Sequence, residues 1–213
     1  MLSVYFAGEL FSSKHLFGNA ALADCIAKLS KLQFVCVLPQ TLEDRGLGAH
    51  YIRDLDILTL LNCDLALFNF DGPELDSGTV VEFLFAKFAD IPAVILRTDF
   101  RQGGDQTGDP WNLMASFYPR TKTVLVDSME LYKGFLNEGF APVQAGQSLI
   151  EHVARLVLAE FELLRHVPTV LTENLAEPVY RWLARMPGFQ APESIEKVMS
   201  ILTQKRAKGL LPY

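Results

Sequence analysis

Short apolar runs alternate with helically spaced apolar residues through the chain up to about residue 145. A short apolar run that ends at glycine, proline or a charged residue is typical of a buried strand. Apolar residues at i, i+3, i+4 and i+7 indicate a helix with one buried face. The pattern predicts strands at residues 2–7, 34–38, 65–70, 93–97 and 123–126, and helices at residues 19–32, 50–62 and 79–89.

The predicted strands are apolar on both faces, which favours a parallel sheet covered by helices on both sides. We therefore expect an α/β fold with a five-stranded, doubly wound parallel sheet of flavodoxin-like or Rossmann-like type. Such sheets bind ligands beyond the carboxyl ends of their strands, near the switch point. That rule directs attention to the segments after Phe6, Phe70 and Arg97.

The pattern changes near Ala145, after which helical spacing continues without any further strand. The helices predicted there span residues 148–165, 178–186 and 194–208. We expect an α/β domain at residues 1–144 and a helical extension at residues 145–213. The extension would pack on the sheet domain or on a neighbouring subunit.

The composition and the net charge limit the kinds of ligand and the cellular compartment that we expect for this protein. The 213 residues are 50% hydrophobic and 21% charged, and the formal net charge is −6, so a sizeable core is expected and a broad nucleic-acid-binding face is not. No apolar run is long enough to span a membrane, and the N-terminus lacks the basic region of a signal peptide. Three cysteines without Cys-x-x-Cys spacing favour buried free thiols. We expect a cytoplasmic protein that binds a small molecule.

The stretch from Asp71 to Glu82 carries the most chemical information. It leaves the third strand, turns at Gly72-Pro73 and enters a helix that Asp76 or Ser77 can cap. Helical side chains lean toward the N-terminus, so Glu82 is expected to point toward the mouth of the sheet, near Asp76. Two carboxylates in one partly dry pocket divide into a nucleophile and an acid. The alternative is that Asp76 only caps the helix and Glu82 is solvated.

Three further residues are candidates on weaker grounds. Asp56 lies on the same helical line as Ile52 and Leu60, where an acid is costly without a partner unless that face is exposed. Tyr5 is near the carboxyl end of the first strand and either fills the core or fixes the rotamer of a carboxylate. Gly8 either allows close approach to a ligand or makes a turn.

The segment before the fifth strand contains a long loop, residues 98–110, of the kind that forms lids or binding loops. Asn112 follows it, either as a ligand contact or as a helix cap, and spacing alone favours the cap. The chain lacks a P-loop, a complete dinucleotide-binding glycine motif and a Gly-x-Ser-x-Gly elbow, and its histidines lack metal-ligand spacing. We expect no metal and no cofactor.

Four segments, in order, resemble the nucleoside 2-deoxyribosyltransferase family. The third is similar to the family's Asp-x-Gly-x-x-x-Glu motif and the fourth to its Asn-Leu-Met segment. The resemblance covers roughly residues 3–140, and the helical extension departs from it. The segments are Val4-Tyr-Phe-Ala-Gly8, Ile52-Arg-x-x-Asp56 followed by Asp64, Asp76-Ser-Gly-Thr-Val-Val-Glu82, and Trp111-Asn-Leu-Met114.

The resemblance implies two successive displacements at C1′ of a 2′-deoxynucleoside. Glu82 would attack C1′ and expel the base, and a second base would attack the same face, giving net retention. Asp76 would protonate the departing base and deprotonate the incoming one. Tyr5 would orient Glu82, and Asp56 would hold the edge of the base.

The resemblance also implies an assembly. Asn112 would reach the sugar hydroxyls of a neighbouring subunit, so the active form would be a homo-oligomer. No cofactor is required, because the nucleophile and the acid are both side chains. The residues expected to bind substrate are Asp56, Asn112, Gly8, Phe11 and Asp71.

One enzymatic alternative is an N-glycosidase that hydrolyses deoxynucleoside monophosphates. It needs a phosphate site after the first strand. Ser12, Ser13 and Lys14 could bind a phosphate there, but Glu9 repels it.

Two non-enzymatic alternatives are a phospho-receiver domain and a nucleoside sensor. Asp71 ends the third strand, where a receiver carries its phosphorylated Asp. A receiver also needs an acidic pair after strand one and a Lys after strand five, and neither is present. The intact pair of Asp76 and Glu82 argues against a sensor without turnover.

Overall fold

The chain forms a five-stranded, all-parallel sheet in the order β2-β1-β3-β4-β5, which confirms the predicted doubly wound α/β fold. The computed structural model describes residues 1–42, 45–99 and 112–213. The order reverses at β1, so the switch point lies between β1 and β3, where a ligand site is expected. The strands are β1 Leu2–Ala7, β2 Phe34–Val37, β3 Leu65–Asn69, β4 Ala93–Arg97 and β5 Thr121–Leu125.

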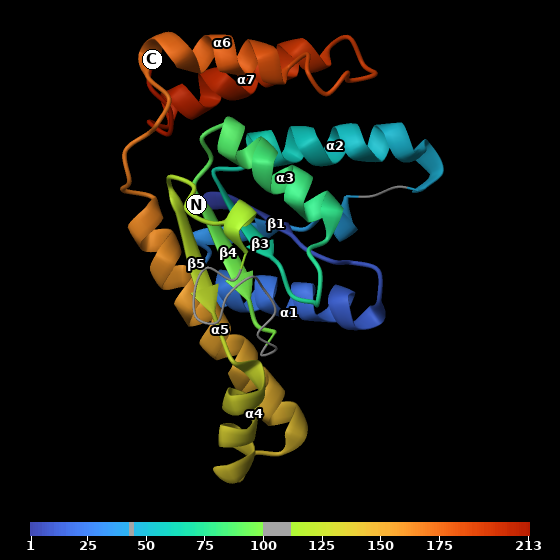
Figure 1. Ribbon diagram of the computed structural model, residues 1–213, viewed down its shortest axis with the longest axis vertical. Helices are drawn as coiled ribbons and strands as arrows, with labels where there is room; N and C mark the ends of the chain where they lie inside the picture. Colours follow the sequence, from blue (N-terminus) through green and yellow to red (C-terminus); the bar gives the residue numbers. More distant parts are fainter. Residues whose placement is uncertain (43–44, 100–111) are drawn as a thin grey trace.

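Helices cover both faces of the sheet (Figure 1). α1 and α5 pack together over one face, and α2 and α3 pack together over the other. α6 and α7 form an antiparallel pair outside α2 and α3, and α4 projects past the carboxyl edge of the sheet. The helices are α1 Ser13–Leu29, α2 Ala49–Asn62, α3 Ser77–Phe88, α4 Ser128–Asn137, α5 Pro142–Leu164, α6 Glu173–Leu183 and α7 Ser194–Ala207.

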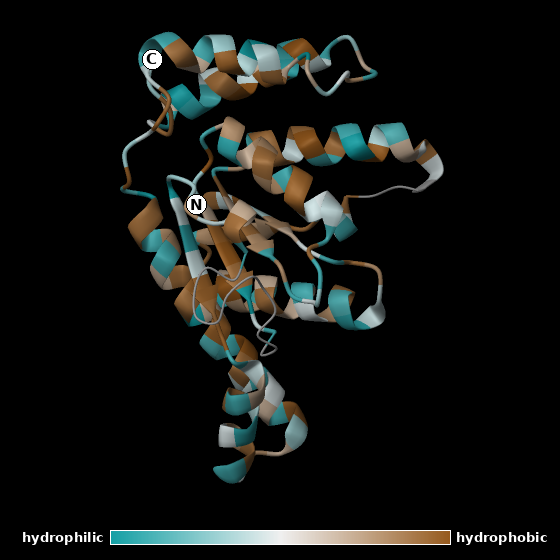
Figure 2. Cartoon of the chain, in the orientation of Figure 1, coloured by the Kyte–Doolittle hydropathy of each residue, from teal (hydrophilic) through white to brown (hydrophobic). Residues whose placement is uncertain are grey.

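Alternate residues of each strand enter the two halves of the core. In β1, Tyr5 and Ala7 join the cluster under α2 and α3, whereas Val4 and Phe6 join the cluster under α1 and α5. Figure 2 shows the central strands as mainly hydrophobic and β5 as more polar, as expected for an edge strand. The side on which Tyr5 lies is therefore the side of α2 and α3.

Several helices differ from the predictions, and α6, for example, spans Glu173–Leu183 rather than residues 178–186. α1 begins at Ser13 rather than residue 19, because the Ser12 side chain caps it by accepting from the His15 N–H at 3.2 Å. Its first turns are exposed and carry no apolar stripe. α4 was not predicted, and it has no buried residue that would mark a core-facing side.

α5 crosses the expected division between residues 144 and 145, since it begins at Pro142. It packs on α1, and the rings of Phe34 and Phe161 lie 5.4 Å apart. α5 therefore belongs to the layer of helices that covers the sheet. Of the expected helical extension, only α6 and α7 lie outside that layer. Within the described residues, no helix is both long and apolar enough to cross a bilayer.

Candidate active site

Tyr5 and Glu82 meet at the carboxyl edge of the sheet. The Tyr5 hydroxyl donates a hydrogen bond of 2.6 Å to Glu82 Oε1. Tyr5 comes from β1 and is fully buried, whereas Glu82 comes from α3 and is half-buried. One carboxylate oxygen is therefore held by a buried donor, and the side chain keeps partial access to solvent.

The electrostatics keep the Tyr5 phenol protonated. Burial, followed by the negative charges of Glu82 and Asp56, raises the pKa of Tyr5 well above its usual value. A phenol that stays protonated remains a hydrogen-bond donor to the carboxylate over the ordinary pH range. The charge of Asp56, on α2, contributes to this rise in the pKa of Tyr5.

Asp76 stands at the amino end of α3, as predicted. Its Oδ2 accepts from the Thr79 N–H and from Thr79 Oγ1, both at 2.8 Å, so Asp76 is the N-cap of the helix. Capping and proton transfer are compatible, because Asp76 is half-buried and carries a second oxygen. Asp76 and Glu82 therefore share the amino-terminal half of one helix.

Asp71 braces the ends of two strands. Its Oδ1 accepts from the Thr98 and Asp99 N–H groups, and its Oδ2 accepts from Thr98 Oγ1 at 2.7 Å. These bonds tie the segment after β3 to the segment after β4. The Asp71 carboxylate thus stabilises the ends of these two strands, and its expected contact with substrate stays a prediction.

Gly8 lies against β3 at the switch point. A Cβ at this position would stand 3.1 Å from Asn69 Cβ and 3.2 Å from Asn69 O. A larger residue would have to displace Asn69 by a few tenths of an ångström, so the close packing at this point favours glycine. Phe11, three residues farther on, is 74% exposed and presents its ring to solvent near the start of α1.

Asn112 caps a short 3₁₀ helix, Leu113–Ala115, by accepting from the Met114 and Ala115 N–H groups, both at 3.0 Å. Spacing alone favoured this capping role. Its contact with a neighbouring subunit stays a prediction. Of the long loop predicted before it, residues 100–110 lie outside the described residues.

A cavity of about 210 Å³ opens on the other face of the sheet, beneath α1 and α5. Its polar end includes Glu9, Lys14, His15 and Asp71, and its floor includes Phe6. Glu9 Oε2 lies 3.1 Å from His15 Nε2. Because Tyr5 points to the opposite face, this cavity does not contain the Tyr5–Glu82 pair.

Some functional contacts could not be read from the sequence. Asn69 Oδ1 accepts from the Asp71 N–H at 3.1 Å, and Arg97 donates to the Phe70 carbonyl at 2.7 Å. Both residues order the mouth of the sheet, and their position at strand ends was the available signal. In the part of the chain that is described, His, Cys, Asp and Glu form no group of three or more arranged to hold a metal ion.

Two solved structures are similar to this chain. The chain is similar to a conserved protein from Enterococcus faecalis V583, with 28% identity, 78% of this chain and 97% of that chain covered, and a TM-score of 0.44. It is also similar to a 2-desoxiribosyltransferase from Leishmania mexicana, with 21% identity, 66% and 100% covered, and a TM-score of 0.46. Neither TM-score reaches 0.5, and a search of curated proteins gives no match.

The decisive comparison is with a family model. It matches residues 4–114, more than half of the chain, and the match includes β1, α2 and α3 with Tyr5, Asp56, Asp76 and Glu82. The family acts on small nucleoside and nucleobase substrates. The match therefore spans both elements that make the Tyr5–Glu82 contact, β1 and α3, and the chain belongs to the nucleoside 2-deoxyribosyltransferase family.

Proposed function

We propose that the protein transfers 2-deoxyribose from one nucleobase to another through a covalent intermediate on Glu82. The observation that carries this proposal is the 2.6 Å hydrogen bond from the buried Tyr5 hydroxyl to Glu82 Oε1. The bond fixes one oxygen, so the carboxylate has a defined rotamer from which it can attack. Preorganisation of this kind is how a carboxylate becomes an effective nucleophile.

In the first step, a Glu82 oxygen forms a bond to C1′ and the bond from C1′ to the base nitrogen breaks. The electron pair leaves with the base, and Asp76 supplies the proton that neutralises it. The transition state resembles an oxocarbenium ion, which the negative charge of Glu82 stabilises.

In the second step, a nitrogen of a new base attacks C1′ and the ester bond to Glu82 breaks. Asp76 takes the proton that the new base loses, so both carboxylates return to their starting states. Two inversions give net retention at C1′. Asp56 binds the edge of the base, and no cofactor is involved in either step.

The local charge favours nucleosides over nucleotides. Glu9 follows β1, where a phosphate would be bound, and its carboxylate lies near Gly72, 3.7 Å from the place of a Cβ on that residue. The Ser12 hydroxyl is engaged as the cap of α1. Glu9 therefore repels a 5′-phosphate at this point and disfavours hydrolysis of nucleoside monophosphates, whereas Lys14 and His15 beside it would attract one.

The experiment incubates several deoxynucleosides with several free bases, with and without a 5′-phosphate, and separates the products by chromatography. Exchange without net release of base supports the transferase, and release from monophosphates alone supports the hydrolase. Glu82→Ala should fold and lose exchange, and a peptide containing Glu82 should gain one deoxyribosyl mass in the wild type. An active Glu82→Ala variant without any mass gain would overturn the proposal.

A further inference from the structure

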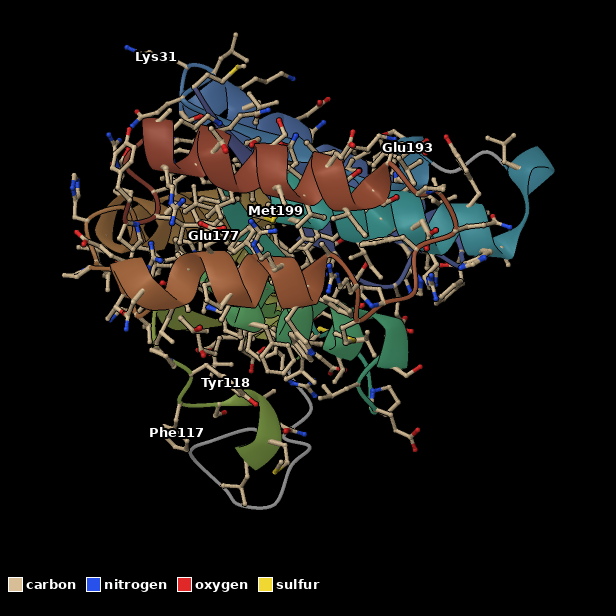
Figure 3. The ribbon with its side chains drawn as sticks, turned by 90° about the horizontal axis from the view of Figure 1, so that it is seen from above. Lys31, Phe117, Tyr118, Glu177, Glu193 and Met199 are labelled. Atoms are coloured by element: carbon tan, nitrogen blue, oxygen red, sulfur yellow. The ribbon has the colours of Figure 1, made fainter. Side chains whose placement is uncertain are left out.

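The C-terminal helices lie on the two helices that carry the proposed catalytic acids. α7 packs along α2, which holds Asp56, and α6 lies on the side of α3, which holds Glu82. The Phe88 and Trp182 rings meet edge to face with centroids 6.0 Å apart. Figure 3 looks down on α6 and α7, with Glu193 just before the start of α7.

Each C-terminal helix holds the end of one of these helices through a buried side chain. Tyr180 of α6 donates to the Ala89 carbonyl at 3.0 Å, and Ala89 is the C-cap of α3. Lys205 of α7 donates to the carbonyl of Cys63, which is the C-cap of α2. Carbonyls at helix ends lack intrahelical partners, so these donors satisfy groups that would otherwise be orphaned in the core.

A third contact holds α2 near its amino end. Asp54 Oδ2 accepts from the N–H of Gln190, in the segment that joins α6 to α7, at 2.8 Å. Arg53 donates to Asp54 Oδ1 at 3.0 Å and to the Gly188 carbonyl at 3.1 Å. Burial would raise the pKa of Asp54, but the hydrogen bonds from Gln190 and Arg53 lower it below its usual value, so the buried carboxylate stays charged.

Asp54 and Asp56 project from nearly opposite sides of α2. Residues two apart on an α-helix are separated by about 200° around its axis. Asp54 therefore faces the C-terminal pair, whereas Asp56 lies on the opposite side of α2, where its Oδ1 is buried and its charge contributes to raising the pKa of Tyr5. A rotation or shift of α2 would move both carboxylates together.

We propose that the α6–α7 pair is a positioning element of the active site, and that Asp54 is the residue through which it fixes the place of Asp56. The inference rests on the proposed function, because Asp56 acts there on the base. α2 is held from outside at Asp54, in its second turn, and at Cys63, its C-cap. Asp56 lies between these two points, so its placement depends on a segment that the family model does not match.

The test is a double-mutant cycle on base exchange. Asp54→Ala should lower kcat/KM by roughly tenfold or more, mainly through KM for the acceptor base, as expected when a contact group is displaced. The same change made in the Asp56→Ala background should cost nothing further, because there is no carboxylate left to position. Asp54→Asn, which keeps an oxygen for the Gln190 N–H, should keep most of the activity.

Lys197→Ala is the matched control, since Lys197 lies on α7 in an exposed pair with Glu193 at 3.9 Å. It should leave exchange unchanged. If thermal melting shows that Asp54→Ala does not fold, the same cycle is measured with Asp54→Leu, which replaces the charged group by an apolar one. The inference would be overturned if Asp54→Ala lowered kcat/KM equally in the wild type and in the Asp56→Ala variant, or if Asp54→Ala were fully active. A folded wild type without any exchange would instead overturn the proposed function itself.

Discussion

Tyr5 Oη and Glu82 Oε1 lie 2.6 Å apart although the two residues are 77 positions apart in the chain. One comes from the central strand of the switch point and the other from the helix that follows β3. The fold brings them together because both elements end or begin at the carboxyl edge of the sheet. A phenol that burial and nearby carboxylates keep protonated is a permanent donor, so it can hold Glu82 in one orientation.

Tyr5→Phe should therefore slow the formation of the deoxyribosyl-enzyme without unfolding the protein. A hydrogen bond to a charged group contributes about 1.5–3 kcal/mol, which corresponds to a loss of roughly 10- to 100-fold in rate. Single-turnover kinetics with a deoxynucleoside measure the effect. Tyr132→Phe, which removes an exposed hydroxyl bonded to Pro142, is the control and should react normally. An unchanged single-turnover rate in Tyr5→Phe would show that the phenol does not orient Glu82.

Asp76 has two roles that substitutions can separate, since it caps α3 and is proposed to exchange a proton with the base. Asp76→Asn should retain the cap, because asparagine is an equally good N-cap, yet it should lose about 100-fold or more in base exchange. Asp76→Ala should lose activity and also about 1 kcal/mol of stability. Thermal unfolding and exchange rates measured together separate the two effects.

The control for Asp76 is Asp127→Asn, since Asp127 caps α4 by the same kind of bond, to the Glu130 N–H at 2.9 Å. It should change neither stability nor exchange appreciably. Full exchange activity in Asp76→Asn would assign the proton transfer to another group.

Lys205 gives the stability a dependence on pH. Burial lowers the pKa of this lysine to about 8 from its usual 10.5. Between these values the unfolded chain holds the proton and the folded chain has released it, so the free energy of unfolding rises with pH in this window. Lys205→Met should remove that contribution. The stability of the wild type relative to Lys205→Met should therefore increase from pH 7 to pH 10.

Urea unfolding across this pH range measures the difference, and it cancels the titration of groups that both proteins share. Lys197→Met, a change at an exposed lysine, should run parallel to the wild type. If the two curves for wild type and Lys205→Met also run parallel, Lys205 keeps its proton in the folded state.

The fold was predictable because its strands are short and strongly apolar and alternate with helices. The exceptions have physical causes. α4 has no fully buried residue and touches the core only through partly buried side chains such as Leu131, and the first turns of α1 are exposed. β5 begins with Thr121 and Lys122, which suit an edge strand but do not form an apolar run.

The candidate site was predictable to the extent that strand ends determine it. The rule about carboxyl edges marks the ends of β1 and β3, and the lean of helical side chains directs Glu82 toward them. The pairing of Tyr5 with Glu82 was implied only by the resemblance to the family. The contact between Asp54 and Gln190 spans 136 positions and joins a side chain to a backbone N–H, so no residue pattern marks it. The role of Asp71 in joining the segments after β3 and β4 could not be predicted for the same reason, because two of the groups that donate to it are backbone N–H groups.

The last prediction concerns assembly. We expect Asn112 to complete the active site of a neighbouring subunit, and Asn112→Asp tests this because aspartate preserves the cap on the Met114 and Ala115 N–H groups while removing the amide donor. Asn112→Asp should fold and lose exchange. Mixed with inactive Glu82→Ala, it should regain activity, since one site of each mixed pair combines an intact Glu82 with an intact Asn112.

For dimers that form at random from equal amounts of the two variants, roughly one quarter of the sites should be active. Unfolding and refolding the mixture allows subunits to exchange, and each variant treated alone is the control. Light scattering gives the subunit number under the assay conditions. A monomer with full activity, or a mixture that stays as inactive as its components, would place Asn112 outside any shared site and leave it only as the cap of its 3₁₀ turn.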